Sequence, residues 1–421
     1  MAGGKVVAVL PPGETALAQN VLDATGRHLL PGLVDVHAHL REPGLTHKED
    51  FDSGTMAAAL GGVTTVLDMP TDEPWTATPA QLSAKMAMAK GRLHVDVGFQ
   101  VVMSRSIADL DALLQLRPVS LEVFTADVPD AFLFESLDEV RETLRRLASR
   151  DTLIGISPGD QSILRGSLLR ESAGDIAAFL SSRPPLAEAG GIARAMLAAA
   201  ETGARIHVRQ VNSRLGVDTW RRLRDMADAS VETTPQNLFF TAEDYATGGA
   251  HLKGSPPFRA RDDVAALRAA LSEGLVDIVA TDHAPHSPAE KAARYAAFAD
   301  IPGGMPGLQT LLAVMLKLVG ENVIRMTDLV RMCSYNPARR FGLGRSKGAI
   351  ATGHDADIVI IDRGRTGVIT HDEQASRAAY TPFDGWVAPA ALTHVLLRGE
   401  RIVSEGMLVA PGRGRVVTRQ D

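Results

Sequence analysis

The 421-residue sequence contains almost no cysteine and no long apolar run. Its single cysteine, Cys333, excludes an internal disulfide framework and any cysteine-based zinc cluster, and we expect it to be a small buried apolar residue in a reducing compartment. No stretch approaches the about 18 apolar residues that cross a bilayer, and the first residues lack the apolar core of a signal peptide. We therefore expect a cytoplasmic protein with no membrane partner.

An excess of charge of one sign is lacking as well. Forty-four Lys and Arg residues stand against fifty Asp and Glu residues, the formal net charge is −6, and neither sign forms a long block. A nucleic-acid partner therefore has no electrostatic support. Aromatic residues make up 5% of the chain and indicate no interface patch, while the 45% of apolar residues is typical of a globular protein with a large core.

What the sequence does contain is an alternation of two kinds of segment. Short runs rich in Val, Ile and Thr are separated by stretches in which apolar residues recur every three to four positions. Eight short runs are predicted to be strands: 33–40, 63–69, 95–101, 121–125, 153–157, 205–211, 230–240 and 277–282. The helices predicted between them include 52–60, 79–90, 137–149, 192–202, 219–227 and 261–273. Eight such units that close on themselves form a (β/α)8 barrel, the α/β fold that we predict.

The two ends of the chain lack this alternation. Residues 5–10 near the start and several short runs after residue 348 are typical of antiparallel β-structure without helices. We expect residues 1–31 and 348–421 to form one small β-sandwich domain, with the barrel over residues 32–347. The Gly412–Arg415 segment is expected to be a solvated tail.

Three polar residues stand where a barrel of this type carries its chemistry, at the carboxyl ends of the strands. His37 and His39 are two positions apart at the end of the first predicted strand, so both side chains point to one face and can converge on one metal ion. Asp282 ends the eighth strand, where it can reach the same point, bind a metal ion and carry a proton. The alternative for Asp282 is the N-cap of the next helix. We expect a metal site at His37, His39 and Asp282.

These residues lie in a series of motifs that resembles the cyclic amidohydrolases, the family that includes dihydroorotase, allantoinase and hydantoinase. The series begins with Leu30-Pro31-Gly32-Leu33-Val34-Asp35-Val36-His37-Ala38-His39-Leu40-Arg41-Glu42-Pro43-Gly44, Gly61-Gly62-Val63-Thr64-Thr65 and Asp68-Met69-Pro70. It continues with Val231-Glu232-Thr233, Lys253 to Arg259, Thr281-Asp282-His283-Ala284-Pro285-His286, Asn336-Pro337-Ala338 and Gly353-His354-Asp355-Ala356-Asp357-Ile358-Val359. The resemblance covers nearly the whole chain. Arg41 and the segments 44–50 and 282–286 are most similar to dihydroorotase.

The resemblance implies a barrel with a β-sandwich from both termini, and a metal-activated water that attacks the carbonyl carbon of a cyclic amide. Asp282 would take the proton from that water and return it to the leaving nitrogen. Family members tend to form dimers or tetramers, so a homo-oligomer is expected. They also carry about one more pair of strands before residue 4, so either the start codon is misplaced or the domain is shortened at its start.

The sequence departs from the family at the second metal site. The lysine that bridges two ions in the family is replaced by Glu122, which is either a direct metal ligand or a surface or salt-bridged carboxylate. Ser157 and Gln210 stand where strands five and six supply histidines, and neither is a good ligand for zinc. His207, on the other face of its strand, is expected to be a packed core or helix-side residue. We therefore predict one divalent ion, zinc by the resemblance, with the second site lost.

The substrate positions of dihydroorotase match Arg41, Thr71 and His286 here, where Thr71 replaces an asparagine. Ser255 replaces a second asparagine, so the pocket has one amide fewer. A bidentate guanidinium suits a carboxylate, and this favours an anionic cyclic amide as substrate. The alternative for Arg41 is an ion pair with Glu42 or Asp72.

Three functions remain open on these grounds. The first is a dihydroorotase-like hydrolase of a cyclic amide, and the second is an allantoinase, hydantoinase or cyclic imide hydrolase. The third is a non-catalytic homologue that keeps the fold as a scaffold or partner subunit, because ligands of the second metal are missing. Nothing in the sequence argues for a lyase or an isomerase.

Overall fold

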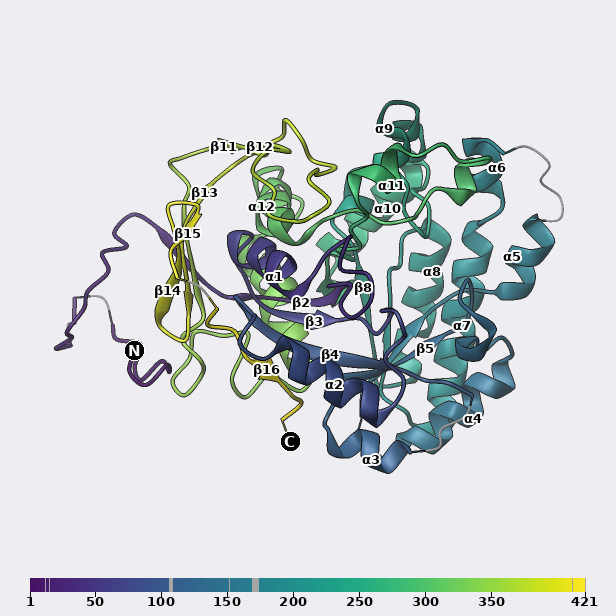
Figure 1. Cartoon of the computed structure of the whole chain (residues 1–421), viewed down its shortest axis with the longest axis horizontal. Helices are drawn as coiled ribbons and strands as arrows, with labels where there is room; N and C mark the ends of the chain where they lie inside the picture. The colour runs from purple at the N-terminus through teal and green to yellow at the C-terminus, as the bar shows by residue number, and fades with distance from the viewer. Residues whose placement is uncertain are drawn as a thin grey trace.

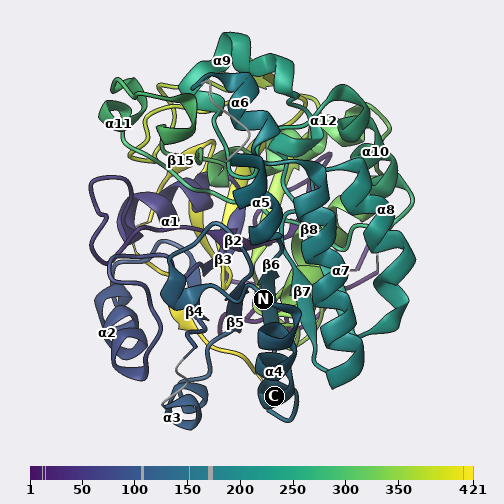
Figure 2. The same ribbon diagram turned by 90° about the vertical axis from the view of Figure 1, so that its right-hand side faces the viewer.

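The barrel contains eight parallel strands, β2 to β9, which pair in chain order. In the computed structural model, residues 1–11, 13–14, 16–105, 109–150, 152–168, 174–410 and 412–420 are described. The strands are β2 (Leu33–Ala38), β3 (Val63–Asp68), β4 (Asp96–Val102), β5 (Ser120–Phe124), β6 (Ile154–Ser157), β7 (Ile206–Val208), β8 (Ala229–Thr233) and β9 (Ile278–Val279). Ala38 and His283 form the parallel bridge that brings the last strand back to the first. The (β/α)8 prediction is confirmed, and Figure 2 shows the strands surrounded by helices.

Eight of the described helices cover the outside of the barrel. They are α1 (Phe51–Leu60), α2 (Pro79–Ala89), α3 (Leu110–Gln115), α4 (Leu137–Ala148), α7 (Pro185–Thr202), α8 (Arg214–Leu223), α10 (Arg261–Ser272) and α12 (Leu311–Gly320). Both α2 and α4 begin with a capping box, Thr78 with Gln81 and Ser136 with Glu139, which satisfies free N–H groups at the first turn. Three consecutive alanines of α1, residues 57–59, are fully buried, so this helix packs closely on the strands.

Further helices complete the connections between the strands. Those in the loops that follow the strands are α5 (Gln161–Leu168), α6 (Ile176–Ser181), α9 (Tyr245–Leu252) and α11 (Pro288–Ala292). After α12 come α13 (Met326–Val330) and α14 (Asn336–Arg340), and the buried Cys333 lies between these two, as expected. None of the helices in the described parts of the chain is both long and apolar enough to cross a membrane.

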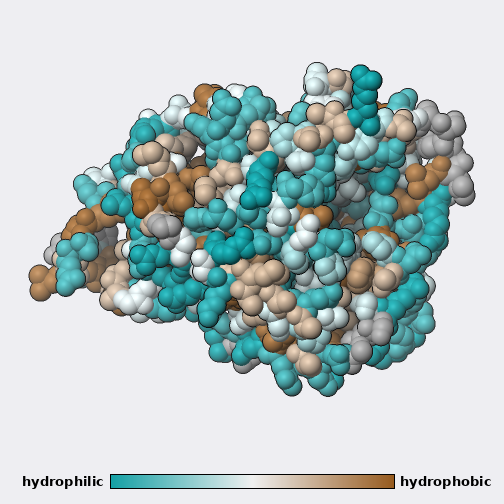
Figure 3. Space-filling model, viewed as in Figure 1, coloured by the Kyte–Doolittle hydropathy of each residue, from teal (hydrophilic) through white to brown (hydrophobic). Residues whose placement is uncertain are grey.

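Both termini contribute to a second, antiparallel sheet beside the barrel (Figure 1). Its strand order is β1 (His28–Pro31), β10 (Ile358–Asp362), β13 (Ala391–Leu397), β14 (Glu400–Ser404) and β15 (Met407–Leu408), and a separate pair is formed by β11 (Gly367–Val368) and β12 (Val387–Ala388). The predicted strand at residues 5–10 is wrong. Only Lys5 of this run forms bridges, and Val7 and Val9 are more than half exposed, so the alternating pattern has no sheet to pair with. Figure 3 shows hydrophobic residues at the projecting end of the molecule where this segment lies.

The C-terminal tail returns to the barrel. Its strand β16 (Val416–Val417) runs parallel to β4, and Gly414 donates a hydrogen bond to the carbonyl of Leu93. Gly414 is needed for this approach, because a Cβ atom there would lie 2.0 Å from the carbonyl oxygen of Val95. Gly412, Arg413 and Arg415 are exposed, as expected for a solvated tail, but the segment is not free, because Gly414 and Arg415 form backbone hydrogen bonds to Leu93 and Val97.

The seventh predicted strand, 230–240, also differs from the structure. The strand β8 ends at Thr233, and Gln236–Leu238 form a turn of 3-10 helix. Pro235 lies between them and lacks the N–H that a strand would need. The apolar residues 238–240 prolong the strand pattern in the sequence although they belong to the following turn.

Candidate metal centre and active site

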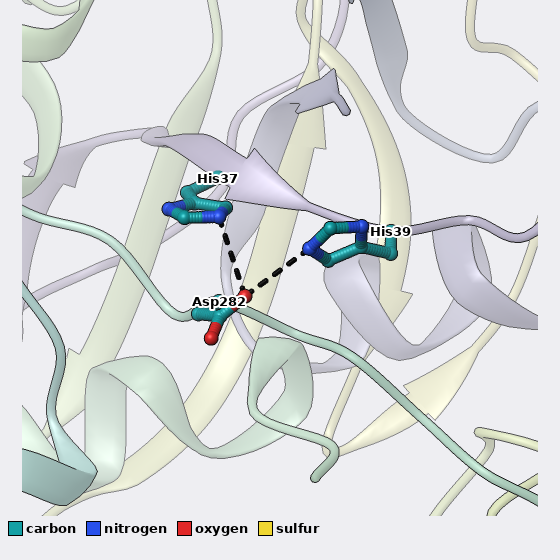
Figure 4. A group of neighbouring side chains, drawn as sticks. All are labelled: His37, His39 and Asp282. Carbon is teal, nitrogen blue, oxygen red and sulfur yellow. Dashed lines mark hydrogen bonds and ion pairs between the residues drawn. The ribbon is translucent and has the colours of Figure 1, made fainter. Parts of the chain in front are cut away.

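Two histidines and one aspartate meet at the carboxyl end of the barrel strands. The Nε2 atoms of His37 and His39 lie 3.3 and 3.2 Å from the same oxygen, Oδ1 of Asp282 (Figure 4). Within the described chain, these three residues each offer one ligand atom, and the three atoms lie within 4.8 Å of one another. The strand geometry produces this convergence, because positions 37 and 39 share one face of the chain at the end of β2.

Each histidine is held by a partner at its other ring nitrogen. Nδ1 of His37 lies 2.5 Å from Oε1 of Glu232, and since a carboxylate only accepts, Nδ1–H donates. Nδ1 of His39 lies 2.7 Å from the hydroxyl of Thr71. These bonds fix the ring orientations and leave both Nε2 atoms directed at one point, as metal-ligating histidines require. Burial lowers the pKa of His39 to about 4, so this ring is uncharged at neutral pH and can bind a metal ion through Nε2.

A fully buried arginine lies behind this group. Arg209, just after β7, donates to Glu122 on β5 and to Glu232 on β8. Glu122 is therefore a salt-bridged carboxylate and lies outside the three-donor group, which is one of the two alternatives that the sequence left open. His207 is fully buried and hydrogen-bonds through Nε2 to Glu232, so it faces the barrel interior and does not reach the metal donors.

Gln210 and Ser157 are the residues that the resemblance aligns with histidines at the ends of strands five and six. The side-chain amide of Gln210 donates to Oδ2 of Asp282, so it holds the carboxylate whose other oxygen faces the two rings. Ser157 lines the cavity in front of the group. Gln210 and Asp282 both have positive φ angles, 49° and 46°, as does Arg41 at 60°. Residues other than glycine rarely adopt this backbone conformation, and such strain is common at functional sites.

Arg41 is the first of the expected substrate residues. It is 9% exposed, and its buried Nε finds no hydrogen-bond partner in the described structure. Glu42, the neighbour that could have neutralised it, pairs with Arg92 instead. Asp72, the other expected partner, pairs with Lys85, and Arg41 is not among the residues that line the cavity in front of the three donors.

Thr71 and His286, the other two, differ in what they contact. Thr71 is turned toward His39, whereas Nε2 of His286 lies 3.0 Å from the carbonyl oxygen of Gly303. Burial and the nearby Arg41 and Lys48 lower the pKa of His286 to about 2, so that ring is neutral. Of the two, only His286 is without a role in holding a metal donor.

A cavity of about 230 Å³ opens in front of the three donors. Its polar lining includes His37, His39, Asp282, Gln210 and Ser255, so Ser255 lies where the sequence placed it. Apolar lining comes from residues such as Met69, Phe124 and Leu164. A small cyclic molecule fits this volume, and the lining offers it both polar and apolar contacts.

Comparison with known proteins gives the family. The Amidohydrolase family profile matches residues 183–402, just over half of the chain, and the Dihydro-orotase-like profile matches residues 26–215. The chain belongs to the amidohydrolase family. Dihydroorotases of Halobacterium salinarum and Methanothermobacter thermautotrophicus are 36% and 32% identical to this amidohydrolase; the alignments cover 92% and 95% of it and 89% of each relative.

Solved structures agree with this assignment. The L-hydantoinase (dihydropyrimidinase) of Arthrobacter aurescens superposes on the amidohydrolase with a TM-score of 0.94 at 28% identity, covering 99% of this chain and 94% of that one. The dihydropyrimidinase of Brevibacillus agri gives a TM-score of 0.90 at 28% identity over 99% and 93% of the two chains. The resemblance to the cyclic amidohydrolases is thereby confirmed.

Two residues of this site have no role in the sequence-based expectation. Glu232 is named there only as part of a motif, and no role is assigned to Arg209, whereas its neighbour Gln210 is compared with a metal ligand. A signal for both exists, since a charged residue inside a barrel strand or at its end must be paired when buried. Which acid pairs with which base depends on side-chain reach across the barrel, and the sequence does not contain that distance.

Proposed function

We propose that this amidohydrolase opens a cyclic amide by hydrolysis and uses one divalent ion, for which zinc suits the donor set of two imidazoles and a carboxylate. The observation that carries the proposal is the convergence of two Nε2 atoms and Oδ1 of Asp282, with both Nδ1 atoms held from behind. A scaffold has no physical need for two oriented imidazoles and a carboxylate aimed at one point. Such an ion polarises a carbonyl and lowers the pKa of a water molecule toward neutrality.

The protein's own residues have separate roles in this proposal. His37, His39 and Asp282 would hold the ion, and Asp282 would also accept a proton from water and return it to the leaving nitrogen. Gln210 keeps the Asp282 carboxylate oriented through its amide N–H. Apolar residues such as Phe124 provide walls that exclude bulk water from one side of the cavity.

The substrate class follows from Arg41. A buried guanidinium is expensive unless it is paired, and the unpartnered Nε of Arg41 indicates that an anionic ligand completes its hydrogen bonds. Burial lowers the pKa of Arg41, while the charges of Asp282 and Asp72 oppose this. We propose an acidic cyclic amide, with dihydroorotate as the first candidate because the curated relatives are dihydroorotases. Hydantoins come second, from the solved relatives.

The test measures metal content and ring opening together. Protein purified without chelators is analysed for bound metal and assayed, with added zinc or manganese, on dihydroorotate, allantoin, hydantoins and cyclic imides. We expect about one ion per chain, and loss of at least 100-fold in rate in Asp282→Asn, because proton transfer alone contributes about 10²–10⁴. Asp262→Asn, at an exposed position of α10, is the matched control and keeps full rate.

Two results would contradict the proposal. One is protein with less than about a tenth of an ion per chain that added metal does not restore. The other is ring opening that survives in Asp282→Asn. An Arg41→Met variant separates the substrate classes, since its KM rises for an acidic substrate and stays the same for a neutral hydantoin.

A further inference from the structure

Arg209 has its whole hydrogen-bonding capacity satisfied inside the barrel. It is fully buried, and all five of its N–H groups find acceptors. Nε and Nη2 reach the two oxygens of Glu122 at 3.2 and 2.8 Å, and Nη1 reaches Glu232 at 3.1 Å and the carbonyl oxygen of Val36 at 2.9 Å. The second Nη2 bond goes to Oε1 of Gln100. The guanidinium therefore stands between two carboxylates that belong to different parts of the barrel, β5 and β8.

The two carboxylates have little freedom to move away from this cation. A Cβ atom on Gly155 would lie 2.1 Å from Oε2 of Glu122, so the glutamate is pressed against the backbone of β6. Glu232 is fixed by three bonds, from His37, His207 and Arg209.

The arginine lies directly behind the metal donors. One continuous chain of bonds runs from Arg209 to Glu232 and from Glu232 to Nδ1 of His37, whose Nε2 faces Asp282. Arg209 also lines the same cavity as the three donors, and its neighbour Gln210 holds Asp282. One end of the centre thus contains two carboxylates that already share a cation belonging to the protein.

We propose that Arg209 is a built-in cation: it takes the place that a second divalent ion would occupy between Glu122 and Glu232, limits the centre to one ion, and positions Glu232 against His37. The inference rests on the single-ion site of the proposed function. Two carboxyl groups buried this close together are stabilised by a nearby positive charge, which either a guanidinium or a divalent cation supplies. Removal of the guanidinium therefore leaves a site with two facing carboxylates for a metal.

The experiment counts ions instead of measuring activity. Wild type, Arg209→Lys, Arg209→Met and the double variant Arg209→Met/Glu122→Gln are dialysed against excess Mn²⁺, washed, and analysed for metal per chain. We expect one ion in wild type and Arg209→Lys, close to two in Arg209→Met, and one in the double variant, which retains only one carboxylate. In the double variant the remaining ion should bind about 10–100-fold more weakly, because Glu232 has lost the partner that holds it against His37.

The outcomes separate the two proposals. No ion in wild type contradicts the proposed function, whereas one ion in both wild type and Arg209→Met, with equal affinity, contradicts only this inference. Should Arg209→Met unfold without metal, the inference predicts that Mn²⁺ restores its folding and raises its Tm by several degrees more than in wild type. Failure of Mn²⁺ to restore it would overturn the inference.

Discussion

At the scale of single residues, the geometry and the family pattern assign different partners to the hydroxyl of Thr71. The pattern assigns Thr71 to the substrate carboxylate, but its hydroxyl lies 2.7 Å from Nδ1 of His39. Thr71→Val keeps the shape and removes this bond. We expect about 10-fold or more weaker metal binding, as for other partners of metal ligands, with KM for an acidic substrate unchanged once metal is saturating. Chelator competition and steady-state kinetics provide the two measurements.

Thr71→Ser is the matched control, because it retains a hydroxyl that can reach His39. Metal affinity close to wild type in Thr71→Ser, with a loss in Thr71→Val, supports the orienting role. A higher KM with unchanged metal affinity in Thr71→Val would instead return Thr71 to the substrate, as the sequence pattern suggests.

Single residues also show how much of the site can be predicted from the sequence. His37 and His39 are predictable because the two-residue period of a strand fixes their common face. The salt bridge of Glu122 is not, because its partner Arg209 is 87 positions away and their contact depends on two long side chains meeting inside the barrel. The role of Arg41 is only partly predictable. Its charge points to an anionic ligand, and only the structure shows that Glu42 is already paired with another arginine.

At the scale of elements, the apolar runs predict where barrel strands lie, but a run alone does not show that its strand has a partner. β3 begins at Val63 and β6 ends at Ser157, as predicted, because buried parallel strands read as continuous apolar segments. The run at residues 5–10 has the pattern of a strand without a partner. Pairing is a property of the neighbouring element, so a strand pattern alone does not establish a sheet.

The short helix α11 lies beside the site and provides a pH test. Burial raises the pKa of Glu290, but the Ser287 N–H and Lys48 outweigh this and lower it from 4.5 to about 2. An acid whose pKa is lower in the folded state stabilises the fold above its unfolded pKa, and loses this contribution as the pH falls through the folded value. We therefore expect Glu290→Gln to lower Tm at pH 6, and this difference from wild type to vanish between pH 4.5 and 2.

Thermal unfolding of the two proteins from pH 7 to pH 2 checks this expectation. The amide that Glu290→Gln introduces can still cap the first turn of α11, so the variant isolates the charge from the cap. Glu373→Gln, at an exposed turn, serves as the comparison. A Tm difference that stays constant over the whole range would show that the charge of Glu290 is not involved.

At the scale of the whole molecule, one buried lysine joins the barrel to the terminal sheet. Nζ of Lys347 lies 2.5 Å from Asp96 at the start of β4, 2.6 Å from Asp357 just before β10, and 3.0 Å from Asp355. These three carboxylates also form a possible metal group by distance, but the ammonium already occupies their centre. Arg398, just after β13, also reaches Asp96 and bonds to a carbonyl of the tail, so the tail is held by the same cluster.

Breaking this cluster should destabilise the fold without changing the chemistry. Lys347→Met leaves three carboxylates, two of them almost fully buried, without their shared cation, and removal of one partner of a buried ion pair typically costs about 3–5 kcal/mol. Arg325 and Asp328 form an exposed pair that contributes little, so Arg325→Ala is the control. We expect chemical denaturation to show the large loss in the free energy of unfolding only for Lys347→Met.

The metal content per folded chain should stay the same in both variants. The cluster lies at the amino end of β4 and the metal donors lie at the carboxyl end of β2, which are opposite ends of a barrel of parallel strands. Metal analysis of the folded fraction checks this separation, and lost metal in Lys347→Met would show that the two ends are coupled. A loss of stability below about 1 kcal/mol in Lys347→Met, well short of the cost of an unpaired buried charge, would mean that apolar contacts join the two sheets instead.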